Sequence, residues 1–179
     1  LERSVVMRPI VSRALAGVLI CLSTLAAGVR AQGDGPEDLA AMALESLKAG
    51  LKSRDMDSVE VALTDLDSVY DKVSAKTVKD IGKAVTSVFK TRPRAPKEPG
   101  EDTREELIDS YRLAIGLVFE RPEGGALLTG GLKQKHLKDW PDMRAAMVEG
   151  LGYRRDPGLV STFAGMLEDA APQVAGAAT

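Results

Sequence analysis

The residue types that most often perform chemistry in proteins are scarce in this 179-residue chain, which contains one cysteine, Cys21, and one histidine, His136. Thiolates and imidazoles are the usual nucleophiles, proton carriers and transition-metal ligands. A disulfide framework, a Cys/His zinc site and a covalently attached haem each require more of these side chains than the chain has. His136 lies in a short basic run with no serine nucleophile near it, and so is poor evidence for a catalytic base.

Two other stretches resemble ligand-binding motifs but lack the residues that would hold the ligand. The glycines at 125 and 130 have the spacing of a phosphate-binding loop, but Gly131-Leu132 stands where Lys and Ser or Thr are needed. Asp55-Met56-Asp57 begins like a calcium loop, but Val59-Glu60 follows where an oxygen ligand and glycine belong. We therefore expect no catalytic residue, no cofactor and no metal site, and predict that the protein is not an enzyme.

Composition indicates a globular chain large enough for one domain or two small ones. Hydrophobic residues make up 44%, charged residues 28% and aromatic residues 4% of the sequence. The formal net charge is −2. Binding to nucleic acid is driven largely by a basic surplus, so this balance argues against a nucleic-acid partner.

The N-terminal 31 residues have the pattern of a secretory signal peptide, preceded by an upstream extension over residues 1–6. Met7-Arg8 opens a short basic region, and residues 14–27 form an apolar run. Val29-Arg30-Ala31 places small residues for cleavage before Gln32. The run is shorter than the ~20 residues that a membrane span needs, although an uncleaved anchor is the alternative. We expect export to the periplasm or the medium, without membrane attachment after cleavage.

Apolar residues recur at helical spacing from residue 32 to residue 91, which predicts N-terminal helical pairs. The expected inner face of the first helix is Leu39, Met42, Ala43, Leu47 and Leu51. The second is expected to bury Val59, Ala62, Leu63, Leu66, Val69 and Tyr70, and the third Val78, Ile81, Val85, Val88 and Phe89. Asp57 or Ser58 is predicted to cap the second helix, and Ser74 begins the third.

Residues 92–102 contain three prolines and predict a loop or linker, with a docking peptide as the functional alternative. A longer helix is expected over residues 103–120, opened by a capping box between Thr103 and Glu106. No stretch alternates between polar and apolar residues with a period of two, so no strand is predicted.

A weak internal repeat lies near the C-terminus, where residues 140–147 align with residues 171–178 at an offset of 31. Pro141 matches Pro172, and Ala146 matches Ala177. Pro141, Met143-Arg144, Leu151-Gly152 and Asp156-Pro157 follow the order of a short HEAT-like repeat.

Residues 141–178 therefore resemble the HEAT-like repeats of the type found in phycobilisome lyases, although Ala175 stands where arginine is usual in the second copy. The resemblance implies an all-α, right-handed α-solenoid of antiparallel helix pairs with a concave binding surface. Residues 103–179 would be such repeats, cut off at the C-terminus and belonging to a longer chain.

These features favour an exported, non-enzymatic scaffold that binds another protein. The alternative is an accessory repeat segment of a larger exported enzyme whose catalytic domain lies elsewhere. Contacts with a partner are expected from Trp140, Arg144, Arg154 and Arg155. Packing at a repeat joint is the favoured interpretation of Trp140, with an exposed binding anchor as the alternative.

Overall fold

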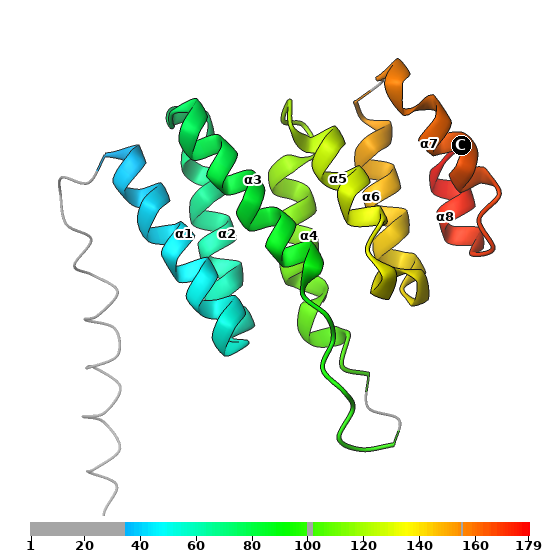
Figure 1. Ribbon diagram of the computed structural model, residues 1–179, viewed down its shortest axis with the longest axis horizontal. Coiled ribbons are helices and arrows are strands. Elements are labelled where there is room, and N and C mark those ends of the chain that lie inside the picture. The colour runs from blue at the N-terminus through cyan, green and yellow to red at the C-terminus, as the bar shows by residue number, and fades with distance from the viewer. Residues whose placement is uncertain (1–34, 100–101, 155) are drawn as a thin grey trace, which may run out of the picture. The chain divides into compact units, whose positions relative to one another are not determined.

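The computed structural model describes residues 35–99, 102–154 and 156–179, and every regular element within them is helical (Figure 1). The predicted all-α class is confirmed. The predicted signal peptide lies outside the described residues. The α-helices of the described part are α1 (Pro36–Ser53), α2 (Met56–Val69), α3 (Ala75–Lys90), α4 (Ile108–Val118), α5 (Gly124–Leu132), α6 (Pro141–Gly152), α7 (Val160–Leu167) and α8 (Pro172–Ala177). None of them is both long and apolar enough to cross a membrane.

Residues Gly35–Thr179 form one compact unit whose helices lie in two layers. In one layer α1 contacts α3, and α3 contacts α5. In the other, α2, α4, α6 and α8 follow one another in contact. Each odd-numbered helix also packs on the even-numbered helix that follows it, as the pairs in Figure 1 show.

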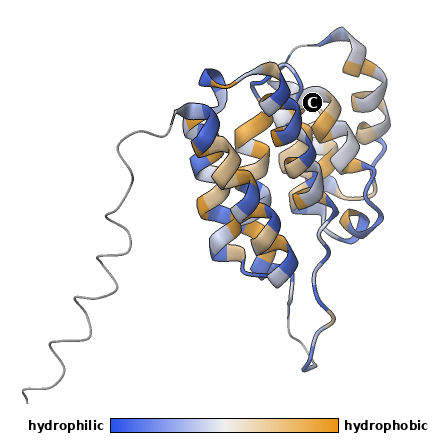
Figure 2. Cartoon of the chain, turned by 60° about the vertical axis from the view of Figure 1, so that its left-hand side comes forward, coloured by the Kyte–Doolittle hydropathy of each residue, from blue (hydrophilic) through white to orange (hydrophobic). Residues whose placement is uncertain are grey.

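The apolar core fills the space between the two layers. Figure 2 shows polar and apolar residues on opposite sides of the same helices, the pattern of helices that bury one stripe. One cluster runs from Leu47 of α1 through Val85 of α3 to Leu151 of α6. A smaller one joins Val148 of α6 to Val174 of α8. The Pro-rich residues 92–102 therefore connect two helices that share one core.

The predicted inner face of α1 is wrong at two positions. Leu39 and Met42 are 41% and 60% exposed, whereas Ala40 and Leu44 are buried. The apolar residues of α1 cover more than one side of the helix, so their spacing alone is consistent with two different buried faces. Within the described residues α1 packs mainly against α2 and α3, and it buries the side that carries Ala40, Ala43, Leu44, Leu47 and Gly50.

The cap predicted for α2 is wrong. Asp55, rather than Asp57 or Ser58, caps α2 by accepting the backbone N–H of Ser58 at 3.2 Å. Its other carboxylate oxygen accepts the Ser58 hydroxyl at 2.6 Å. The third helix begins next to Ser74, as predicted, and Ser74 caps α3 by accepting the backbone N–H of Thr77.

The expected capping box does not form, and the helix expected over residues 103–120 is shorter. Thr103 Oγ1 donates instead to the carbonyl oxygen of Arg94 at 2.7 Å, and Glu106 binds Arg54. A turn of 3₁₀ helix over Glu105–Leu107 precedes α4, which begins at Ile108. Thr103 and Glu106 therefore bond to residues on the other side of the loop and do not form the expected capping box with each other.

Candidate interaction surface

Trp140, the first of the predicted contact residues, lies inside the molecule. Its side chain is 5% exposed, and its ring centroid is 5.2 Å from that of Tyr111. Its aromatic neighbour is in α4, whereas Trp140 immediately precedes α6. Trp140 therefore packs at a joint between helices, which is the interpretation the sequence favours over an exposed anchor.

Arg144 and Arg154 are also engaged in contacts within the chain. Arg144 of α6 forms an ion pair with Asp169, which follows α7, and the Arg144 guanidinium lowers the pKa of that carboxyl group. Arg154 Nη1 donates to the carbonyl oxygen of Phe119 at 3.2 Å, and Nη2 donates to that of Pro122 at 3.0 Å. Arg155 lies outside the described residues. These arginines hold successive helices together rather than lining one shared surface.

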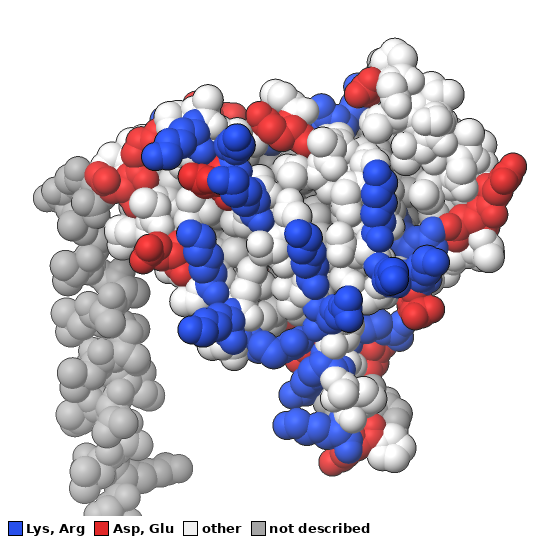
Figure 3. Space-filling model, in the orientation of Figure 1, with Lys and Arg blue, Asp and Glu red and all other residues white. Residues whose placement is uncertain are grey.

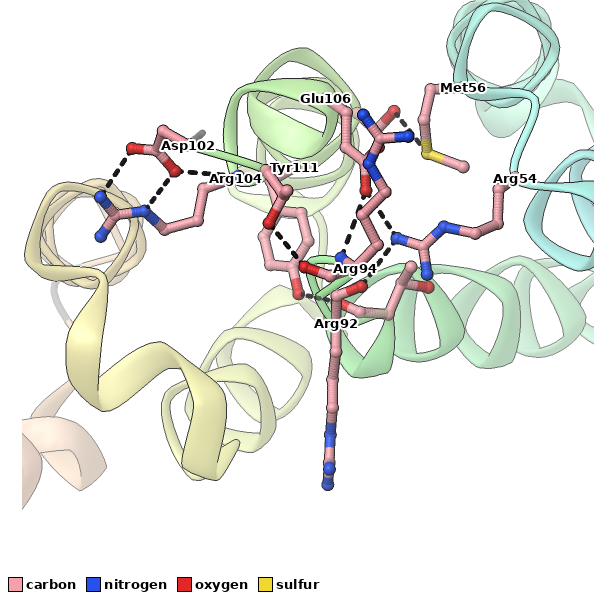
Figure 4. A network of polar contacts seen from close by, with 11 residues as sticks. Arg54, Met56, Arg92, Arg94, Asp102, Arg104, Glu106 and Tyr111 are labelled. Carbon is pink, nitrogen blue, oxygen red and sulfur yellow. Dashed lines mark hydrogen bonds and ion pairs between the residues drawn. The ribbon is translucent and has the colours of Figure 1, made fainter. Parts of the chain in front are cut away.

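The Pro-rich loop is anchored at its base by a polar network, drawn in Figure 4. Arg54 Nη2, from the turn between α1 and α2, donates to Glu106 Oε1 at 2.7 Å and to the carbonyl oxygen of Arg92 at 2.8 Å. Arg94 Nε lies 3.4 Å from the other oxygen of Glu106. The Glu106 carboxylate therefore links the two ends of the loop to the turn between α1 and α2.

A second anchor holds the loop to the segment before α6. Arg104 donates two hydrogen bonds to Asp102, from Nε to Oδ1 at 2.8 Å and from Nη2 to Oδ2 at 2.6 Å. These bonds lower the pKa of Asp102 to about 2. The same guanidinium donates to the carbonyl oxygen of Asp139 at 3.0 Å. The residues between the two anchors, from Ala95 to Pro99, are exposed, and the loop extends beyond the helices in Figure 1.

His136, the residue singled out by the sequence, belongs to a partly buried cluster around the buried Tyr111. The Tyr111 hydroxyl lies 2.9 Å from His136 Nε2 and 2.9 Å from the carbonyl oxygens of Phe89 and Thr91. Burial raises the pKa of Tyr111. Burial, together with the nearby Arg92 charge, lowers the pKa of His136 and favours the neutral imidazole. The cluster joins α3, α4 and the segment before α6.

The most uniform exposed feature of the described residues is a line of lysines along α3, which we call the lysine row. It consists of Lys76, Lys79, Lys83 and Lys90, all exposed. The opposite side of α3 is buried against the core, including Ile81 and Val85. In Figure 3 lysine and arginine side chains gather on the face that carries α1 and α3. By contrast, α2 in the other layer contains four acidic residues and no basic one.

Sequence analysis predicted the buried side of α3 but missed the lysine row. The signal was present, because lysines separated by three, four and seven residues fall on one side of a helix. The neighbours of α3 were not predictable from the sequence. In the structure α3 lies between α1 and α5, with the lysine row on its exposed side.

Within the described residues, no group of three or more His, Cys, Asp or Glu side chains is arranged to hold a metal ion. Comparison with models of known protein families, with curated proteins and with solved structures found no match. The class of protein that fold and surface define is therefore an all-helical protein with a basic face. A proposal for the function of this chain therefore has to rest on the packing and the surface described above.

Proposed function

We propose that this chain is an exported α-solenoid of the HEAT-like type, right-handed and non-enzymatic, which binds another protein. The observation that carries the proposal is the pairwise packing of α1 on α2, α3 on α4, α5 on α6 and α7 on α8, with the even-numbered helices in unbroken contact. Stacked helix pairs of this kind offer a long, regular surface, which suits partner binding.

The position of the internal repeat supports the same proposal. Pro141 begins α6 and Pro172 begins α8, and these helices are neighbours in one layer. The repeat offset found in the sequence thus relates equivalent points of successive helix pairs. Proline suits the first turn of a helix because no backbone N–H is needed there.

Export is proposed from residues 1–31 alone. The test is to express the whole chain in a bacterium, separate the periplasm and medium from the cytoplasm, and measure the mass of the purified protein. Export predicts a mature form beginning at Gln32 outside the cytoplasm. A full-length protein found only in the cytoplasm would contradict the proposal.

Partner binding is tested by affinity capture with residues 35–179, which form one compact unit. The folded bait is immobilised, exposed to envelope extract and to culture medium, and compared with an unrelated helical protein of similar size and charge. The proposal predicts one protein captured in near-stoichiometric amount by this bait only. A helical, soluble bait that captures nothing above the control would overturn it.

A further inference from the structure

We propose that the lysine row binds an acidic α-helix of the partner protein, laid along α3. This inference rests on the proposed function and names the chemistry of its partner. Four outward lysines on a single helix, against one acidic residue, make the most one-sided basic helix of the described part.

The spacing of the lysines matches the repeat of a second helix. Lys76, Lys83 and Lys90 are each seven residues apart, so they rise by about 10 Å per step along the axis. Lys79 lies between the first two. An α-helix with Asp or Glu at intervals of three, four and seven residues presents carboxylates at the same rise, as paired helices do along their charged edges.

Most of these lysines have no ion-pair partner in the described part of the chain. Lys83 Nζ lies 2.7 Å from Asp80 Oδ1, and it is the only member of the lysine row with such a contact there. The next helix in the layer adds positive charge, because the Lys48 ammonium of α1 lies near enough to Asp80 to lower its carboxyl pKa. The Lys76 ammonium also lies near enough to the carboxyl groups of Glu37 and Asp80 to lower their pKa values. All four lysines of the row are nevertheless exposed and can approach carboxylates of another molecule.

The composition of the surface favours a protein over RNA or a membrane. None of the large hydrophobic side chains exposed in the described residues lies on α3, so the row has no aromatic platform for bases and no apolar group to insert into lipid. Asp80 also lies among the lysines and would repel a uniformly anionic surface. A partner helix accommodates it with one basic residue opposite.

The test uses a fluorescein-labelled 21-residue Ala/Glu peptide with Glu at intervals of three, four and seven residues, and fluorescence anisotropy as the readout. A second peptide of the same composition, with its Glu residues spread around the helix, is the ligand control. We expect the wild-type protein to bind the first peptide more tightly than the second. We expect binding to weaken as salt rises, because the contacts are exposed charge pairs.

Two protein variants with the same change in net charge locate the site. The triple variant K76Q/K83Q/K90Q is expected to bind the first peptide about tenfold more weakly. The variant V61E/T64E/S68E, on the exposed side of α2, is expected to bind it as the wild type does. Circular dichroism checks that both remain helical. Equal loss in both variants, or equal binding of both peptides, would overturn the proposal.

Anionic vesicles of phosphatidylglycerol and phosphatidylcholine, and a single-stranded oligouridine, serve as competing ligands. Binding of either in the absence of peptide binding would also overturn the proposal. Failure here is distinct from failure of the proposed function. A partner captured equally by the wild type and by K76Q/K83Q/K90Q leaves protein binding intact and places it on another surface, whereas capture of no partner rejects both.

Discussion

The hydroxyl of Tyr111 lies 2.9 Å from Nε2 of His136, and this contact joins two segments that are 25 residues apart in sequence. A phenol has one hydrogen to donate, whereas Tyr111 also faces the carbonyl oxygens of Phe89 and Thr91. The histidine that stands out in the sequence as a candidate for chemistry is therefore part of a structural cluster at the end of α3, where the Pro-rich loop begins.

Removing the Tyr111 hydroxyl is expected to destabilise the protein. Tyr111 is fully buried, so Tyr111→Phe leaves one hydrogen-bond acceptor of the cluster without its donor, at a cost of about 1–3 kcal/mol. Urea unfolding followed by circular dichroism measures the change. Tyr153→Phe is the matched control, because Tyr153 is 75% exposed and its loss of a hydroxyl is expected to change stability by less than about 0.5 kcal/mol. Equal midpoints for the two variants would argue against the cluster.

Stability is expected to fall as the pH drops below about 6.5 because of His136. The folded state lowers the pKa of His136 below its usual value of 6.5, so the unfolded chain binds more protons in this range. The stabilisation is present above pH 6.5 and is lost as the pH falls through the folded-state pKa. Unfolding free energies measured at half-unit pH intervals test this, with His136→Gln as the control.

The His136→Gln variant is expected to show a flatter pH dependence over the same window. Carboxyl groups such as Asp102 and Asp169 have lowered pKa values, and their contributions are lost only at more acidic pH. A variant whose stability falls as steeply as that of the wild type just below pH 6.5 would assign the effect to other groups.

Two glycines are expected to respond in opposite directions to replacement by alanine. A Cβ at Gly124 would lie 1.8 Å from the carbonyl oxygen of Val118, so Gly124→Ala forces the backbone apart and costs about 2 kcal/mol or more. A Cβ at Gly116, within α4, would meet nothing within 4 Å. Gly116→Ala is therefore expected to stabilise α4 by about 0.5–1 kcal/mol. Thermal and urea unfolding measure both, and a shift of the same sign in both would contradict this packing.

Glu106 is expected to control the order of the Pro-rich loop more than overall stability. Glu106→Ala removes the exposed ion pairs with Arg54 and Arg94, which together contribute about 1 kcal/mol or less. Limited trypsin digestion is expected to cut after Arg94 faster in this variant than in the wild type. Glu105→Ala, an exposed neighbour, is the control. Equal cleavage rates in the two variants would show that the loop does not depend on Glu106.

The spacing of apolar residues along the sequence was sufficient to predict the all-helical class and most of the buried face of α3. Ile81, Val85, Val88 and Phe89 of α3 were predicted to be inside and are buried, because the spacing of apolar residues on one helix is a property of that segment alone. The start of α3 near Ser74 was predicted for the same reason, since Ser74 bonds to Thr77 within the first turn.

The features that the sequence did not reveal depend on contacts between distant segments. Arg154 binds carbonyl oxygens of residues more than 30 positions earlier, and Thr103 bonds to the loop residue Arg94 in place of its expected cap. Leu39 lies on the side of α1 that the described residues leave exposed. The place of α3 is of the same kind. The lysine row lies opposite the apolar stripe of α3, so its exposure follows from the segment itself, but that α3 lies between α1 and α5 depends on contacts between helices that are distant in sequence.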